Sequence, residues 1–223
     1  MEALIRELPW FLRGVGVALE VLLGVMGLGL FLGLGAAVLQ VYGPPPVSFL
    51  ATALERILRG IPPIVLLLLI FYLPWNLPPL LVAILGLGLC SAAYQSQIFR
   101  TAFLSVAAGE IEAARALGMS GPQAIFHVVL PQAVRRALGP WSNELASEIK
   151  DTSLAYIVGV VEILRQARYV ISYTYGNSLL VFGFCALIYF LLTRLGNSLL
   201  FRLERRLWVP GFVDRRGRLP TRR

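Results

Sequence analysis

The sequence predicts an all-α protein that crosses a lipid bilayer about five times, as a single polytopic domain over residues 1–223. The composition is the first observation: 57% of the residues are hydrophobic and 14% are charged, against roughly 25% charged in an ordinary soluble domain. The second is the arrangement of the apolar residues, which form runs near the roughly 20 residues that one transmembrane helix requires. With a mean hydropathy of +0.75, the chain is not expected to be a soluble domain.

The first two predicted spans are separated by a cluster of prolines. The apolar run over about 14–42 ends before Gly43, and the prolines that follow cannot continue a helix. An amphipathic stretch over 47–60 then leads into a second apolar run over 61–73. We expect these two stretches to form the second span together.

The remaining spans differ in how clearly hydropathy identifies them. The third, about 80–104, follows a proline-rich turn that contains an interfacial tryptophan, Trp75. The fifth, about 178–200, is clearly apolar. The fourth, about 141–163, is the least apolar because it contains ionisable residues, among them Glu144, Glu148, Lys150 and Asp151.

Basic residues predict the orientation of the chain in the membrane. The sequence has 20 basic residues, all arginine except Lys150, and 12 acidic residues, which gives a net charge of +8. Positive charge beside a span marks its cytoplasmic side. With an odd number of spans, the N-terminus is expected outside and the 105–140 segment inside. The stretch 202–223 is predicted to be a basic cytoplasmic tail, with Arg202, Arg205, Arg206, Arg215, Arg216, Arg218, Arg222 and Arg223.

The segment 105–140 is too polar to span the bilayer and is expected to contain two short helices joined by a turn. Gly118 suits the C-terminal end of the first helix, where a left-handed residue is common. Ser120, followed three residues later by Gln123 and with Pro122 in the first turn, forms a capping box that opens the second helix. The sequence therefore predicts a helix, a turn and a helix on the membrane surface.

The spacing of residues in this segment resembles a motif of a known protein family. The stretch Glu112-Ala113-Ala114, then Gly118, then Leu130-Pro131, is similar to the EAA loop of bacterial ABC-transporter permeases, although Val128 stands where that pattern usually has Ile. The chain resembles the polar amino acid permeases in particular, over nearly its whole length. Other similar stretches are Arg59-Gly60, Ala93-Tyr94, Ile98-Phe99-Arg100, Lys150-Asp151-Thr152-Ser153-Leu154, Gly159-Val160 and Glu162-Ile163-Leu164-Arg165-Gln166-Ala167-Arg168.

The resemblance implies a multi-pass transport subunit of the bacterial inner (plasma) membrane that works only in a complex. The implied function is that of the permease of an ATP-binding-cassette importer for polar amino acids. The implied partners are an ATP-hydrolysing subunit, an external substrate-binding protein, and a second permease subunit that is either the same or a related chain. The residues implied to couple the permease to the ATPase are Glu112, Ala113, Ala114, Gly118, Leu130 and Pro131.

No enzymatic role is expected for the chain itself. A phosphate-binding loop needs a Gly-rich backbone and a Lys followed by Ser or Thr, whereas the sole lysine, Lys150, is followed by Asp151. ATP and Mg²⁺ are therefore expected on the partner subunit, and no cofactor is expected in this chain. Cys90 and Cys185 lie in apolar runs without a Cys or His neighbour at metal-ligand spacing, so no metal site is expected.

Polar residues at membrane depth are the candidates for a substrate pathway, because they are costly there and face a bundle interior or a cavity. Ser91, Tyr94 and Gln95 recur at three- and four-residue spacing and share one helix face. Gln97, two residues after Gln95, cannot share that face. The first three are therefore expected to line a pocket, with Gln97 as a further candidate.

Charged residues complete the candidate pathway. An amino acid has a carboxylate and an ammonium group, for which Arg59 and Asp151 are the candidate partners. The alternative is that Arg59 with Glu55, and Asp151 with Lys150, are structural pairs that hold helices together. The sequence leaves both interpretations open.

Two departures from the family pattern bear on specificity. Ile61 stands where the pattern commonly has Thr, and Gln97 stands where it has an acid. Both changes remove polarity or charge, so a neutral or acidic substrate is expected to be favoured over a cationic one such as arginine. The sequence does not identify the amino acid.

The same residues bear on three other classes of function. A transporter driven by an ion gradient would use Asp151 or Glu148 as its ion site, but such folds are usually built from repeats, and no internal repeat is evident. A membrane scaffold that only recruits a partner remains a third class. Nucleic-acid binding by the basic tail is not expected, because the tail has few aromatic and amide side chains with which to read bases.

Overall fold

A computed structural model describes residues 6–174 and 178–207, and every regular element in these ranges is helical. The all-α prediction is confirmed. The elements, in which η1 is a π-helix and η2 a 3-10 helix, are α2 (Leu8–Tyr42), α3 (Pro45–Gly60), α4 (Pro63–Phe71), α5 (Pro79–Leu104), α6 (Ala108–Ala116), α7 (Gly121–Ala124), η1 (Ile125–Val129), α8 (Leu130–Asp151), η2 (Thr152–Val158), α9 (Ile163–Thr174) and α10 (Ser178–Leu207).

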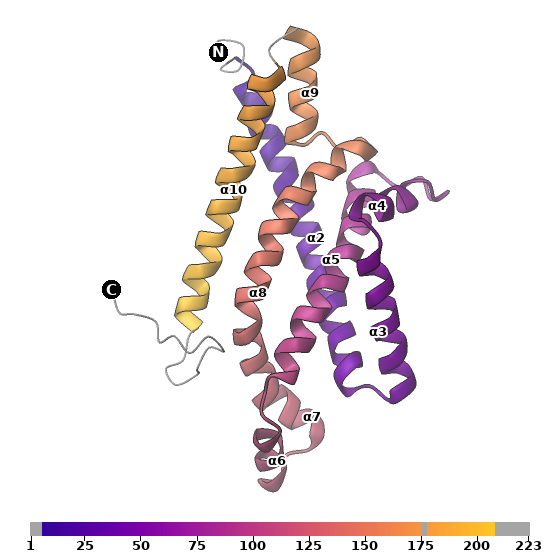
Figure 1. The fold of residues 1–223 in the computed structure, drawn as a ribbon, viewed down its shortest axis with the longest axis vertical. Helices are drawn as coiled ribbons and strands as arrows, with labels where there is room; N and C mark the ends of the chain where they lie inside the picture. Colours follow the sequence, from indigo (N-terminus) through magenta and orange to yellow (C-terminus); the bar gives the residue numbers. More distant parts are fainter. Residues whose placement is uncertain (1–5, 175–177, 208–223) are drawn as a thin grey trace.

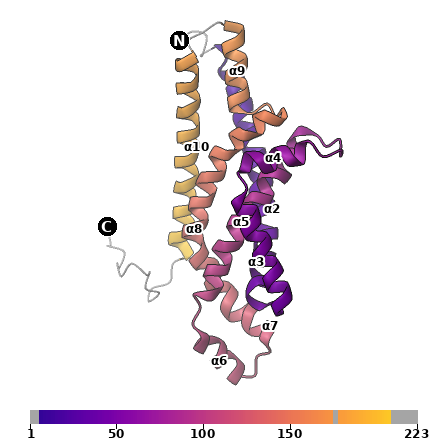
Figure 2. The same ribbon diagram turned by 45° about the vertical axis from the view of Figure 1, so that its right-hand side comes forward.

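The long helices α2, α5, α8 and α10 run along the long axis of the molecule (Figure 1 and Figure 2). α6 and α7 project at one end of this bundle, called here the α6 end, and α9 lies at the other, called the α9 end. α2 and α10 both begin at the α9 end and run toward the α6 end. The predicted tail beyond residue 207 lies outside the described residues, as do residues 1–5.

Among the described residues, three helices are long and apolar enough to cross a membrane: α2, α5 and the Ser178–Arg206 part of α10. α3 and α4 together form the predicted second span, and they are separated by Ile61 and Pro62, because Pro62 provides no N–H to continue the ladder. α8 carries charged residues and is not apolar by the same measure. The helices fit a polytopic membrane protein, and the number of spans stays a prediction.

The helix that carries the fourth predicted span is longer than that span at its N-terminal end. The helix begins well before residue 141, because α7, η1 and α8 follow one another without a break from Gly121 to Asp151. Pro131, in the first turn of α8, cannot donate to the preceding turn and crowds it. The wider π-helical turn of η1 lies at this point, as π-bulges do where the regular helical ladder is interrupted. The 130–140 part of the predicted loop is therefore helix.

A further helix, α9, occupies most of the stretch between the fourth and fifth predicted spans. Its first turn is capped by the buried carboxylate of Glu162, which accepts hydrogen bonds from the N–H groups of Leu164 at 2.7 Å and Arg165 at 2.8 Å. The Tyr189 hydroxyl on α10 donates to the same carboxylate at 2.7 Å. A buried acid therefore ties α9 to α10, and hydropathy alone gives no sign of this.

α2 and α5 approach each other closely along the centre of the bundle. At Gly33 on α2, an added Cβ would lie 2.8 Å from the carbonyl oxygen of Ala92 and 2.9 Å from Cβ of Gln95, both on α5. Small residues allow such close backbone contact between membrane helices. Apolar residues of both helices, with those of α8 and η1, form a buried cluster toward the α6 end, which contains Ala37, Phe99, Ala102, Phe103, Val129 and Ala133.

Gly33→Ala is expected to destabilise the protein by about 1–3 kcal/mol, because overpacking forces the two backbones apart. Thermal unfolding of the purified protein in detergent measures this. Gly35→Ala is the matched control on the same helix, since a Cβ at Gly35 meets no atom within 4 Å, and it is expected to be neutral or slightly stabilising. Equal stability of the two variants would contradict the close contact.

Candidate functional site

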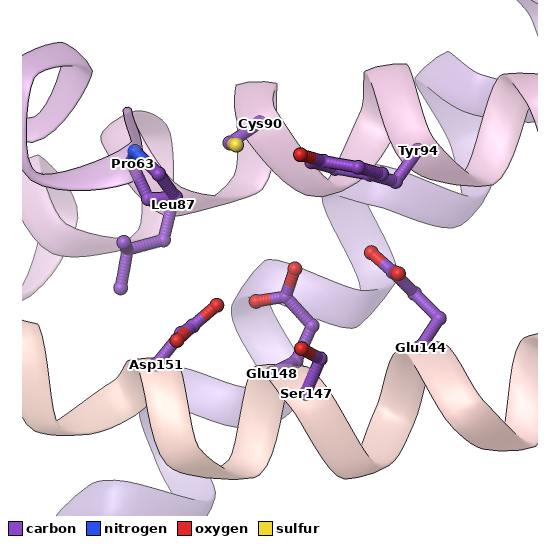
Figure 3. Close-up of a pocket in the computed structure, with 8 residues that line it drawn as sticks. All are labelled: Pro63, Leu87, Cys90, Tyr94, Glu144, Ser147, Glu148 and Asp151. Atoms are coloured by element: carbon purple, nitrogen blue, oxygen red, sulfur yellow. The ribbon is translucent and has the colours of Figure 1, made fainter. Parts of the chain in front are cut away.

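A cavity of about 170 Å³ lies between α5 and α8, beside the start of α4. It is smaller than the roughly 300–1,000 Å³ of sites for drug-sized ligands, and its size therefore suits a small molecule. Figure 3 shows its lining, with the side chains of α8 opposite those of α5. The lining residues are Pro63, Leu87, Cys90, Tyr94, Glu144, Ser147, Glu148 and Asp151.

The cavity is acidic because three carboxylates lie on one face of α8. Glu144, Glu148 and Asp151 are spaced by four and then three residues, which places them in a row on a helix, and all three point toward α5 in Figure 3. Glu148 is 5% exposed. In the part of the chain that the structure describes, none of the three forms an ion pair. Clustered buried carboxylates require compensation by protons or by a positively charged ligand.

Two of the residues predicted to lie along the substrate pathway line this cavity. Tyr94 contributes its ring from α5, and Asp151 contributes its carboxylate from the end of α8. Lys150, the alternative partner of Asp151, has an exposed side chain. The structure therefore brings Tyr94 and Asp151 to opposite walls of one small site.

The other predicted α5 residues are not in the lining. Ser91 and Gln95 are fully buried and hydrogen-bonded to each other at 3.0 Å behind the cavity wall. Gln97 is exposed, in agreement with its predicted position on a different face from Gln95. A shared helix face was predicted correctly for Ser91, Tyr94 and Gln95, but that face is divided between the cavity and the contacts with neighbouring helices.

Arg59 makes the structural ion pair that was one of its two interpretations. Its Nη1 lies 3.0 Å from Oε1 of Glu55, one turn earlier on α3, and Glu55 is 5% exposed. The guanidinium carbon also lies 5.1 Å from the centroid of the Tyr94 ring, within range of a cation–π contact. Arg59 thus touches a residue of the cavity wall without being part of the lining itself.

Glu144 and Glu148 line the cavity, although Glu144 was not predicted as a site residue and Glu148 was considered only as the ion site of a gradient-driven transporter. The signal was present in the sequence, since acids four residues apart in a predicted span share a helix face. What the sequence lacked was the orientation of α8, and this determines whether the row of acids faces a neighbouring helix, a cavity or the lipid.

The predicted helix–turn–helix is confirmed at the α6 end. α6 ends in a Schellman motif, in which the N–H of Gly118 donates to Arg115 and the N–H of Met119 donates to Ala114, at 3.0 and 3.1 Å. Gly118 has a φ of +89°, a left-handed conformation that glycine adopts without strain.

The rest of this segment also has the predicted form. The capping box of Ser120 and Gln123 opens α7, with backbone-to-side-chain distances of 2.8 and 3.4 Å. Leu130 is partly buried, and Pro131 is exposed in the first turn of α8. On α6, Glu112 and Ala113 are exposed whereas Ala114 is buried against the bundle.

A chain of hydrogen bonds joins α6 to the helix that carries the acids. The Arg136 side chain, on α8, donates to the backbone and hydroxyl oxygens of Ser105, the latter at 3.0 Å, and to Oε1 of Gln132 at 3.2 Å. Gln132 in turn donates to Glu110 on α6. Since α7, η1 and α8 are continuous, the exposed segment and the acidic cavity are parts of one connected unit.

A helical membrane bundle with a polar cavity among its helices and an exposed helix–turn–helix at one end has the form of a membrane transport component. Residues 29–209 match the family described as "Binding-protein-dependent transport system inner membrane component". The chain belongs to this family, as a permease component of the amino acid ABC importers. The resemblance inferred from the EAA-type loop is thereby confirmed.

Curated relatives cover almost the whole chain. The chain is similar to the glutamine transport system permease protein GlnP of Escherichia coli (strain K12), with 33% identity over 93% of this chain and 97% of the relative. It is also similar to the L-cystine transport system permease protein TcyB of Bacillus subtilis (strain 168), with 32% identity over 92% of this chain and 90% of the relative. Both relatives are permease subunits of amino acid transport systems.

Solved structures agree with this assignment. A chain of an amino acid ABC transporter, described with histidines, superposes with a TM-score of 0.82 and 30% identity, covering 91% of this chain and 96% of that one. A chain of the MetNI methionine ABC transporter in an inward-facing conformation superposes with a TM-score of 0.76 and 23% identity, over 92% and 99% of the two chains. The second similarity shows the fold alone.

Proposed function

We propose that this chain is the permease subunit of an ATP-driven importer that prefers cationic amino acids. The row of carboxylates on α8 carries the proposal. When Glu144, Glu148 and Asp151 are ionised, one α-ammonium group compensates only part of their negative charge, and a second positive group on the substrate side chain supplies more. No basic residue is present among the described lining residues.

This preference is the reverse of the one expected from Ile61 and Gln97. Those positions lack polarity or charge, but the charge of the cavity is on α8. Gln97 is exposed and lies outside the cavity lining. The absence of a charge on its side chain therefore does not alter the acidic character of the cavity. Arg59 is the candidate partner for the substrate carboxylate. Its guanidinium lies against the ring of Tyr94, which lines the cavity.

The proposed topology has spans formed by α2, by α3 with α4, by α5, by α8 and by α10. The N-terminus lies outside and the α6 end faces the cytoplasm. The arginines support this, since positive charge favours the cytoplasmic side and Arg135 and Arg136 lie near the start of α8, at the α6 end. Arg205 and Arg206, in the last turn of α10, support it as well.

The proposed complex contains this permease, a second permease subunit, a partner that binds Mg²⁺ and ATP, and an external substrate-binding protein. Membership of a binding-protein-dependent transport family supports this assembly. The exposed face of α6, with Glu112 and Ala113, is the proposed contact with the ATPase, because small residues allow a helix to lie deep in a groove. Hydrolysis in the partner then drives translocation through this chain.

Reconstitution tests the proposal. The permease, its ATPase partner and its binding protein are placed in liposomes, and ATP hydrolysis and uptake are measured with arginine, lysine, glutamine and glutamate. Arginine or lysine is expected to stimulate hydrolysis and to be taken up most. Uptake that follows an ion gradient without ATP would instead favour a secondary transporter that uses the α8 acids, and a preference for glutamate would contradict the substrate class.

A further inference from the structure

We propose that Trp141, Gln95 and Ser91 form a hydrogen-bonded chain that positions the Glu144 carboxylate for binding of a cationic group. The inference rests on the proposed function of the acidic cavity and assigns a role to residues behind its wall. Trp141 and Glu144 are on α8, whereas Ser91 and Gln95 are on α5. The chain therefore crosses twice between the two helices that enclose the cavity.

The distances define the chain. The indole Nε1 of Trp141 donates to Oε1 of Gln95 at 2.8 Å, and Nε2 of Gln95 donates to the hydroxyl of Ser91 at 3.0 Å. The Ser91 hydroxyl donates to Oε1 of Glu144 at 3.5 Å. Ser91 and Gln95 are both 0% exposed, so bulk water does not compete for these bonds.

The direction of the bonds follows from the chemistry of the groups. An indole N–H can only donate, and this requires the oxygen of the Gln95 amide to face Trp141 and its NH₂ to face Ser91. The NH₂ group is also a donor, so the Ser91 oxygen accepts there and its own hydrogen is available to Glu144. The chain therefore ends on an acceptor, which is what an ionised carboxylate provides.

α2 closes over the chain on the side away from the cavity. A Cβ added at Gly29 would lie 2.3 Å from Nε2 of Gln95 and 2.9 Å from Oγ of Ser91. Nε2 of Gln95 also lies 3.5 Å from the backbone oxygen of Met26. The amide is thus enclosed by three helices, and it has little freedom to rotate away from Ser91.

The consequence concerns affinity for charge. With its Oε1 3.5 Å from the Ser91 hydroxyl, Glu144 points its carboxylate toward α5 beside Tyr94, where it lines the cavity (Figure 3). Without the chain, the carboxylate must be reoriented when the ligand binds, which costs side-chain entropy. Loss of the chain is expected to weaken binding of a cationic substrate more than that of a neutral one.

Equilibrium binding of arginine and of its neutral isostere citrulline tests the inference, with the permease–ATPase complex in nanodiscs and without the binding protein. Ser91→Ala and Trp141→Phe are expected to weaken arginine binding about tenfold and to change citrulline binding less than about twofold. Ser96→Ala is the matched control, because Ser96 is also fully buried on α5 but its hydroxyl donates to Ala93 within its own helix.

The outcomes separate this inference from the function on which it rests. Arginine binding that Ser91→Ala leaves unchanged would overturn the positioning role, as would equal losses for arginine and citrulline, which indicate a merely structural effect. In the Glu144→Gln background, Ser91→Ala is expected to have no further effect on arginine binding, and a full additional loss would also overturn it. If the wild type binds no cationic amino acid, the proposed function itself fails.

Discussion

Glu148→Gln is expected to lower the affinity of the permease for arginine by about 100-fold, close to 3 kcal/mol. Glu148 is the middle of the three acids and is 5% exposed, so a bound cation that ionises it interacts with the carboxylate at short range, with little screening by water. Glutamine keeps the size of the side chain and removes the charge. The loss therefore reports on electrostatic attraction and not on packing.

The same variant is expected to fold at least as stably as the wild type, because a buried carboxylate without an ion pair costs free energy that a neutral amide reduces. Arginine binding in nanodiscs and thermal unfolding in detergent measure the two effects separately. Glu20→Gln is the control, since it makes the same substitution at an exposed position on α2 and is expected to change neither. A variant that binds arginine as the wild type does would show that the acids do not hold the substrate.

Gly118→Val is expected to abolish most of the stimulation of ATP hydrolysis by substrate in the reconstituted complex. The φ of +89° at this position costs an L-residue about 1–2 kcal/mol, and more for a β-branched one, so the population of the native turn falls about tenfold or more. The exposed residues of α6 then lose their orientation relative to α7. The cavity is expected to keep its affinity for arginine, because α8 is unchanged.

The control is Gly109→Val, in the first turn of α6. A Cβ at either glycine meets no atom within 4 Å, but only Gly118 has a left-handed backbone. A difference in substrate-stimulated hydrolysis between the variants, with equal arginine binding and equal assembly with the ATPase, isolates the turn geometry. Normal stimulation in Gly118→Val would contradict a coupling role for this segment.

The local features of the chain were predictable because neighbouring residues determine them. The apolar runs identified α2, α5 and α10, and the prolines that follow Gly43 marked the end of α2. Ser120 and Gln123 lie three residues apart, and the side chain of each accepts a hydrogen bond from the backbone N–H of the other. Their capping box was therefore visible in the sequence. The spacing around Gly118 also predicted the turn and, by resemblance, the family.

The candidate site was predictable only in part, and α8 shows why. Its row of acids was visible, but hydropathy does not state which neighbour an amphipathic face meets, and the helix was expected to begin later than it does. Of the predicted pathway residues, Tyr94 and Asp151 line the cavity, and their role toward a substrate stays a prediction. Ser91 and Gln95, on the same face as Tyr94, were expected to line the cavity and instead connect two helices.

The sequence by itself determined the helical membrane class, the order of the helices and the form of the exposed helix–turn–helix, because hydropathy, prolines and caps act over a few residues. Only the tertiary structure decided that Glu144 and Glu148 face a cavity, that Glu162 ties α9 to Tyr189, and that Gln95 bonds to Trp141. These contacts join residues far apart in the chain. They depend on how each helix is rotated against its neighbours, and packing of whole helices sets that rotation.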